Sequence, residues 1–427
     1  MDATPDYIAD FSAFLQASPS SYHAAAEVAR RLDGAGFTRL SESESWTPDD
    51  ATGHYVVRDG AVIAWSQPVG AGATTSFRIL GAHTDSPGFK LKPKPTIGSH
   101  GWLQAGVEVY GGPLQNSWLD RELELAGRLV TQDGTEHLVR TGPFLRIPQL
   151  AVHLDREVNN GLTLDRQRHL TPVFGVGDPS EADLLAHLAG LAGLTAADVA
   201  GYDILSNDTQ PPATFGLDQK LFAAARLDNL SSVYAGLHAL IATSPSRAGG
   251  PISVLAAFDH EELGSQSRSG ASGPLLDDIL TRIGHGLGAT GSDRLQAYAE
   301  SWCLSADAGH AVHPNYPERH DPANQPILGG GPLLKINANQ RYATDAHGAA
   351  LWARTCAQAK VDYQEFVSNN TVPCGSTIGP LTATRLGIRV VDVGVPLLSM
   401  HSARELCHVY DPQALAAATA AFFAPEV

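Results

Sequence analysis

Cysteine is scarce in this sequence, and its spacing excludes two kinds of site. The 427 residues contain four cysteines, none within CxxC distance of another: Cys303, Cys356, Cys374 and Cys407. Such wide spacing indicates neither a thiolate zinc site nor a disulfide framework. We therefore expect the cysteines to be reduced and mostly structural, with Cys303 packed as a small apolar residue inside a strand.

Basic residues are also few relative to acidic ones. Lysine and arginine total 29 against 45 aspartates and glutamates, which gives a formal net charge of -16. Nucleic acids and anionic membrane surfaces both require a basic face on their partner. The charge balance therefore argues against either as a partner, although it says little about a small substrate, which meets only the local field.

Targeting signals, long apolar runs and nucleotide motifs are missing as well. The opening MDATPDYIAD has neither the basic nor the apolar region of a signal peptide. No uninterrupted apolar run is long enough to span a bilayer. The segment GGGP at 329–332 is followed by LLKINANQRYAT and not by the lysine-serine and helix start of a P-loop. We expect a cytoplasmic location and no nucleotide binding.

The composition that is present belongs to an ordinary soluble globular protein. Apolar residues make up 43% and charged residues 17% of the chain, and the length predicts two or perhaps three domains. Helical spacing predicts two N-terminal helices over 8–15 and 22–32. A hairpin is expected over 54–65, with a turn at Asp59-Gly60, and a third strand of that meander is expected to lead to His83.

The residue pattern of the sequence changes after His83. Strand-like stretches over 118–130, 136–139 and 143–153 follow a segment rich in glycine and alternating apolar residues. We expect a β-rich domain at 93–213, inserted into a domain formed by 1–92 and 214–427. The alternation of strands and helices in the latter predicts an α/β fold with three layers.

Four strand-like apolar runs each end in a group that can bind a metal. The run 252–258 leads into Glu261 and Glu262 of AAFDHEELG, and three others deliver similar groups: 77–82 is followed by His83 and Asp85, 302–305 by Asp307 and His310, and 390–398 by His401. Catalytic groups collect at the carboxyl ends of strands in open α/β sheets. A single acidic pair is more often a solvated loop, but the fourfold recurrence favours a site.

One further acid lies where a helix is expected to begin. Asp228 precedes Leu230, Val233, Leu237 and Leu240, which have helical spacing. Taken alone, this aspartate is best interpreted as an N-cap. Its alternative role is that of a metal ligand.

Together these residues can form a centre for two divalent cations. Such a centre needs terminal imidazole or carboxylate ligands and a bridging carboxylate, with a position left for water. The candidates are His83, Asp228, Glu262, Asp307 and His401. Asp85 could orient a ligand histidine, and Glu261 could act as the general base. Zinc, cobalt and manganese all tolerate these ligands.

Several longer motifs carry a resemblance to a known family. They are FLQASPSSYHAA, GAHTDSPGFKLKP, IPQLAVHLDRE, ARLDNLSSVYAGL, DHEELGSQSRSGA, SADAGHAVHPNY, LKINANQRYAT and SMHSARE. In this combination, which spans nearly the whole chain, the sequence resembles the aspartyl aminopeptidases, the M18 family of metallopeptidases. The resemblance implies a zinc-peptidase catalytic domain with an inserted dimerisation domain, and an enzyme with two zinc ions that removes N-terminal Asp or Glu from peptides.

The resemblance also implies individual roles. His83 and Asp307 would bind one ion, Glu262 and His401 the other, and Asp228 would bridge them. Glu261 would be the base and Asp85 the orienting acid. His310 and Lys335 match positions that contact substrate, and Lys335 would pair with an acidic side chain. His153 matches a histidine offered to a neighbouring subunit, which implies dimers assembled into a tetrahedral dodecamer.

Two alternatives stay open. A related dinuclear aminopeptidase could prefer neutral residues or accept many, because the metal chemistry is shared by several families while the pocket is not. A non-catalytic carrier or assembly protein could keep the same fold. Retention of Glu261 argues against the carrier, since a carrier needs no general base.

Overall fold

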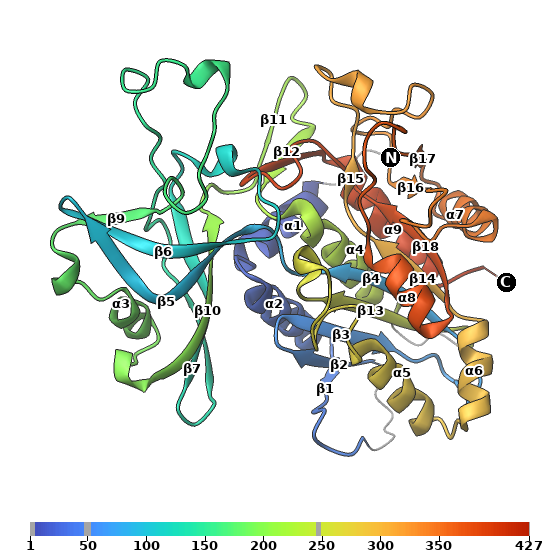
Figure 1. The fold of residues 1–427 in the computed structure, drawn as a ribbon. Helices are drawn as coiled ribbons and strands as arrows, with labels where there is room; N and C mark the ends of the chain where they lie inside the picture. The colour runs from blue at the N-terminus through green and yellow to red at the C-terminus, as the bar shows by residue number, and fades with distance from the viewer. Residues whose placement is uncertain (1–4, 47–52, 245–248, 427) are drawn as a thin grey trace.

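The computed structural model describes residues 5–46, 53–244 and 249–426, and two large sheets dominate it (Figure 1). The larger sheet has nine strands, in the order β1 (Thr38–Arg39), β2 (Gly53–Arg58), β3 (Ala61–Ser66), β13 (Ile252–Phe258), β4 (Phe77–His83), β14 (Trp302–Ala306), β18 (Arg389–Gly394), β16 (Leu333–Lys335) and β17 (Gln364–Phe366). The buried strands β13, β4, β14 and β18 run parallel at its centre.

Helices cover both faces of this sheet, which confirms the expected three-layer α/β fold. Alternate residues of β4 enter two different cores: Leu80 and Ala82 one, Ile79 the other. The first core includes side chains from α1 (Pro5–Ala17), α2 (Ser21–Gly34), α4 (Leu227–Thr243), α7 (Ala346–Ala359) and α9 (Tyr410–Phe423). The second includes side chains from α5 (Leu275–Gly286), α6 (Gly291–Ala299) and α8 (Ile378–Leu386).

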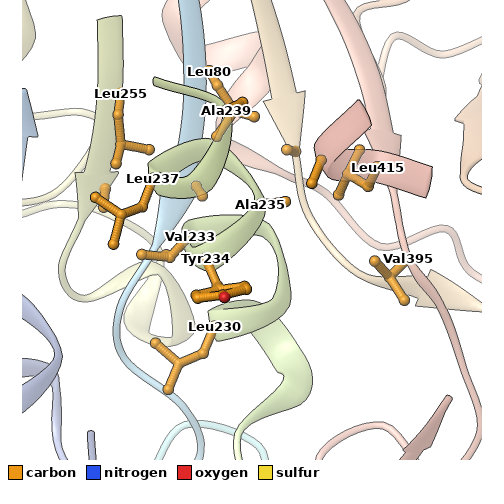
Figure 2. Packing of buried hydrophobic residues seen from close by; sticks show 14 of the residues in the cluster. Leu80, Leu230, Val233, Tyr234, Ala235, Leu237, Ala239, Leu255, Val395 and Leu415 are labelled. Carbon is orange, nitrogen blue, oxygen red and sulfur yellow. The ribbon is translucent and has the colours of Figure 1, made fainter. Parts of the chain in front are cut away.

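Helix α4 is the central helix of the first core (Figure 2). Leu230, Val233 and Leu237 are fully buried or nearly so. They belong to one hydrophobic cluster with Leu80 of β4 and Leu255 of β13, part of which Figure 2 shows. Burying a leucine-sized side chain contributes about 1.5–3 kcal/mol. The start of α4, which carries Asp228, is thereby held against the centre of the sheet.

The smaller sheet has six strands, in the order β8 (Glu136–Arg140), β7 (Leu123–Thr131), β10 (Val199–Asp208), β5 (Gly88–Ser99), β6 (Trp102–Tyr110) and β9 (Val173–Val176). Together with α3 (Leu184–Leu191) it encloses a separate core. The predicted domain boundary near residue 93 falls inside β5, and the division of the chain into domains stays a prediction. In Figure 1 this sheet lies beside the nine-stranded one.

Short strands complete the fold. One sheet joins β11 (Ala213–Phe215), β12 (Leu221–Ala224) and β20 (Glu405–His408). The other pairs β15 (Gly309–His310) with β19 (Pro396–Leu397). Among the described residues, the helices are too short or too polar to cross a membrane.

Three local expectations were wrong. The hairpin of β2 and β3 is not continued by β4, because β13 lies between them, antiparallel to β3 and parallel to β4. The stretch 143–153 forms isolated bridges at Leu145, Arg146 and Ile147 and no continuous strand. The run 390–398 is split into β18 and β19, which belong to different sheets.

Candidate active site

The candidate ligands gather at one edge of the nine-stranded sheet because three neighbouring parallel strands end there. Phe258 at the end of β13 pairs with His83 at the end of β4, and β14 runs parallel to β4 and ends at Ala306, directly before Asp307. The 3₁₀ turn Glu261–Leu263 follows β13. The start of α4 and the loop between β19 and β20 bring Asp228 and His401 to the same edge.

Asp228 lies between the two histidines. His83 Nε2 is 3.4 Å from Asp228 Oδ1 and 3.4 Å from Asp307 Oδ1. His401 Nε2 is 3.3 Å from Asp228 Oδ2 and 3.5 Å from Glu262 Oε1. One carboxylate thus presents a different oxygen to each imidazole, and each imidazole has a second carboxylate of its own.

Both imidazole rings are oriented by backbone carbonyl groups. His83 Nδ1 lies 3.0 Å from the carbonyl oxygen of Asp85, and His401 Nδ1 lies 3.0 Å from that of Gly112. A carbonyl oxygen can only accept, so each Nδ1 must carry the proton and donate it. The lone pair of each neutral ring then sits on Nε2 and faces the carboxylates, as in a metal-ligating histidine.

Two carboxylate oxygens in this cluster lack a hydrogen-bond partner. Asp228 Oδ1 and Glu262 Oε1 are buried without a hydrogen-bond partner, although buried carboxylates are normally satisfied. Ligand atoms of His83, Asp228 and Glu262 all lie within 4.8 Å of one another. Nitrogen and carboxylate oxygen donors at such distances suit a zinc-like divalent cation, and the residues therefore fit a metal centre.

The pKa shifts of these histidines and carboxylates also arise from their burial close to one another. Burial opposes the charged form of His401, but the carboxylates of Asp228 and Glu262 outweigh it and raise the pKa to about 10. Burial likewise lowers the pKa of His83, and the hydrogen bonds to Asp228 and Asp307 raise it well above the usual value. Burial and the Asp228 carboxylate raise the pKa of Glu262. A divalent cation would supply the positive charge that these protons otherwise provide.

Glu261 lies beside this cluster and is partly exposed. Its Oε2 atom is 4.0 Å from His83 Nε2, and 18% of its side chain is accessible. Burial raises the pKa of Glu261 to about 7, with His83 opposing the rise and the carboxylates of Asp307 and Asp228 adding to it. A carboxyl group with a pKa near neutrality can both take and return a proton.

Asp85 holds the turn that carries both glutamates. Its carboxylate accepts the backbone N–H of Glu261 at 2.9 Å and of Glu262 at 3.1 Å, and the hydroxyl of Tyr110 at 2.9 Å. Its Oδ1 atom lies 3.5 Å from His83 Nδ1, farther than its own carbonyl oxygen. The contact with His83 is therefore made mainly through the backbone of Asp85.

Asp228 does not use its side chain as an N-cap. Its φ and ψ of -83° and 105° are non-helical, which an N-cap would share, and those of Asn229 are non-helical as well. Its side-chain oxygens face the histidines, while its backbone N–H donates to Glu405 Oε2 at 2.8 Å. The start of the helix is thus bent so that the carboxylate points into the cluster.

The candidate substrate residues lie on neighbouring elements. Lys335, at the end of β16, is 1% exposed and donates to the carbonyl oxygen of Ala308 at 2.7 Å. Its ammonium group is 5.3 Å from the centre of the Tyr342 ring. His310, at the end of β15, is exposed, and its ring lies 6.3 Å from that of Phe366.

His153 lies elsewhere. It belongs to an exposed segment between β8 and β9, on the side of the six-stranded sheet (Figure 1). Within the described chain this segment supplies no ligand atom to the cluster around Asp228.

Three contributors at the site were not foreseen. Tyr110 and the carbonyl of Gly112 come from β6 and its exit, and Glu405 comes from β20. Glu405 belongs to the motif SMHSARE, so its closeness to His401 in sequence was a usable signal. For Tyr110 and Gly112 the sequence offered no comparable signal, because both lie far from the ligands along the chain.

The cluster thus has the ligand chemistry of a metal-dependent hydrolase, and comparison with known proteins agrees. The family model "Aminopeptidase I zinc metalloprotease (M18)" matches residues 14–423. A probable M18 family aminopeptidase 2 of Streptomyces coelicolor is 54% identical over 420 residues, covering 97% of each chain. The chain belongs to the M18 family, and it is therefore a metalloaminopeptidase of the zinc metalloprotease type.

Solved structures give the same result. A chain in the cryo-EM structure of the Ape4 and Nbr1 complex matches with a TM-score of 0.94 and 34% identity, covering 98% of this chain and 85% of that one. The mature Ape1 dodecamer of Saccharomyces cerevisiae matches with a TM-score of 0.86 and 28% identity, covering 98% and 97%.

Proposed function

We propose that this protein is a dinuclear metal aminopeptidase that releases acidic residues, Asp or Glu, from the N-termini of peptides. The observation that carries the proposal is the position of Asp228, whose two oxygens face His83 and His401 separately. In this proposal Asp228 would be shared by two ions. His83 and Asp307 would complete one ligand set and Glu262 and His401 the other, with zinc as the natural ion and cobalt or manganese as substitutes.

Glu261 is the proposed general base. When bound, the metal ions polarise the peptide carbonyl group and lower the pKa of the attacking water. Glu261 takes a proton from that water on its carboxylate and returns it to the nitrogen of the leaving amine. Asp85 fixes the backbone of Glu261 and Glu262, so that the proposed base and the proposed ligand keep their positions relative to each other.

Lys335 is the proposed determinant of acidic specificity. A buried ammonium group is costly unless it meets a negative charge. Lys335 donates its hydrogen bond to the neutral carbonyl oxygen of Ala308, and it forms no ion pair with a carboxylate in the described part of the chain. The side-chain carboxylate of an N-terminal Asp or Glu would supply that charge. His310, exposed at the end of β15, is the second proposed substrate contact.

We further propose that the β-rich part of the chain, residues 93–213, forms dimers and that dimers assemble into a tetrahedral dodecamer. A related structure is a dodecamer. The segment that carries His153 also exposes Leu150, Val152 and Leu154 by 60%, 49% and 75%, more apolar surface than a solvated loop needs. Burial against a second copy would bring His153 to the neighbouring active site. A cytoplasmic location is part of the same proposal.

The test is hydrolysis of matched Asp, Glu, Leu and Lys aminoacyl substrates by metal-stripped protein, before and after addition of zinc, cobalt or manganese. Restored activity confined to Asp and Glu is the expected result. Restored activity on Leu would overturn the acidic specificity and favour the broad aminopeptidase. No activity with any metal would overturn the enzymatic proposal and favour a carrier.

A further inference from the structure

Glu405 touches the backbone of two metal-ligand candidates at once. Its Oε2 atom accepts the N–H of Asp228 at 2.8 Å, and its Oε1 atom accepts the N–H of His401 at 2.7 Å. The side chain is 2% exposed. A single buried carboxyl group therefore joins the segment that carries the central carboxylate to the segment that carries the second histidine.

Both segments have backbone conformations that regular structure does not maintain. His401 has a φ of 66°, in the left-handed region, which costs a non-glycine residue about 1–2 kcal/mol. Asp228 is non-helical inside the first turn of α4. Such conformations persist only where surrounding contacts enforce them, and the two bonds to Glu405 are contacts of this kind.

Glu405 itself is anchored independently of the cluster. It lies on β20, where it pairs with Ala224 of β12, two residues before Arg226 and four before Asp228. The strand pair fixes the position of the carboxyl group relative to α4. The carboxyl group in turn fixes the distance between the Asp228 and His401 backbones, and hence between the ligand atoms they carry.

We infer that Glu405 is a positioning residue that sets the spacing of Asp228 and His401 for metal binding. This inference rests on the proposed metal centre. Partners behind the ligands of a metal commonly contribute 10- to 100-fold to its affinity. Glu405→Gln keeps the size of the side chain but leaves one of the two N–H groups facing an NH₂ group, which cannot accept.

A matched control exists in the other sheet. Glu124 is 1% exposed and accepts bonds from Arg140 at 2.9 and 3.0 Å and from Asn207 at 3.1 Å. Glu124→Gln makes the same chemical change in an equally buried carboxylate, whose hydrogen bonds go to Arg140 and Asn207 and to no candidate ligand. It separates a general loss of stability from a specific loss of metal affinity.

The experiment is titration of the metal-stripped full-length protein with zinc in competition with a chromophoric chelator, for the wild type, Glu405→Gln and Glu124→Gln. We expect two equivalents in the wild type and in Glu124→Gln. In Glu405→Gln at least one equivalent should bind about 10- to 100-fold more weakly. Visible spectra of the cobalt-substituted proteins give a second readout, because a displaced ligand changes the spectrum of the bound ion.

The outcomes separate the two proposals. Unchanged affinity for both equivalents in Glu405→Gln would overturn the positioning role and leave the proposed function standing. A wild type that binds fewer than two equivalents would overturn the dinuclear proposal and this inference with it. If Glu405→Gln does not fold, Glu405→Asp is titrated in its place, since a side chain one methylene shorter cannot span both N–H groups; unchanged affinity in that variant would equally contradict the inference.

Discussion

The two sheets bury acidic side chains in opposite ways. In the six-stranded sheet, Glu124 is matched by Arg140 in a two-point ion pair, and Asp203 is matched by Lys90 and Arg128. At the edge of the nine-stranded sheet, Asp228 and Glu262 crowd around imidazoles, and each has an oxygen without a hydrogen-bond partner. A matched ion pair satisfies both partners by itself, whereas a group of acids with unpartnered oxygens has room for a positively charged ligand.

The largest effect is expected from Glu261→Gln, which removes the proposed general base and leaves the five proposed metal ligands in place. We expect kcat for an Asp substrate to fall by about 1000-fold, within the usual contribution of general acid–base catalysis. The zinc content should not change, because Glu261 is not a proposed ligand. Hydrolysis at the wild-type rate with normal metal content would contradict the mechanism.

A smaller effect is expected from Lys335→Met, which removes the charge and nearly keeps the volume. The variant should lose about 100-fold in kcat/KM for Asp substrates, because a buried charge pair loses one partner. Activity on a Leu substrate should be unchanged or higher. Equal losses on both substrates would mean that Lys335 supports the fold of the pocket and does not select its substrate.

Glu124→Gln tests the other half of the comparison. Loss of the ion pair with Arg140 should lower the free energy of unfolding by about 2 kcal/mol, less than for a fully buried pair because Arg140 is 45% exposed. Thermal unfolding monitored by circular dichroism measures this change. Metal affinity should stay at the wild-type value, and a loss of zinc would show that the two regions are not independent.

An effect no larger than that of Glu124→Gln is expected at His23 of α2, which is influenced by Arg140 of the six-stranded sheet and by Arg226 beside Asp228. Burial and the charges of Arg140 and Arg226 lower the pKa of His23 to about 4. A depressed pKa contributes stability that is complete above the unfolded value near 6.5 and is lost as the pH falls toward 4. Between pH 7.5 and pH 5 the loss is about 2 kcal/mol by this linkage.

The check is urea unfolding at both pH values for the wild type and His23→Gln. The variant cannot titrate at this position, so its stability should vary less between the two pH values. An identical pH dependence in the two proteins would assign the acid sensitivity to other groups.

Much of the candidate site could be predicted from the sequence because most of its residues closely follow a short apolar run. His83, Asp307 and Glu262 each follow a buried strand, and parallel strands end at a shared edge. A short apolar run followed by a polar group is readable without a structure. His401 was found in the same way, from the apolar run 390–398, although the structure splits that run into β18 and β19. The longer motifs then favoured Asp228, whose own local pattern was ambiguous.

The parts that could not be predicted depend on distant pairing. Glu405 reaches Asp228 across 177 positions of the chain. Its place in SMHSARE sets it near His401, but no local pattern predicts its contact with Asp228. The insertion of β13 between β3 and β4 depends on a crossover that strand patterns do not record. The stretch 143–153 has an apolar pattern but makes only isolated bridges, because pairing also needs a neighbour in register.

The proposed metal centre places Asp228 between two ions at the edge of the nine-stranded sheet. Anomalous diffraction at the zinc absorption edge, from crystals of the zinc-loaded protein, can locate both ions. Two anomalous peaks are predicted, one beside His83 and Asp307 and one beside His401 and Glu262, with an oxygen of Asp228 bound to each. A single peak, or none at this edge of the sheet, would contradict the account.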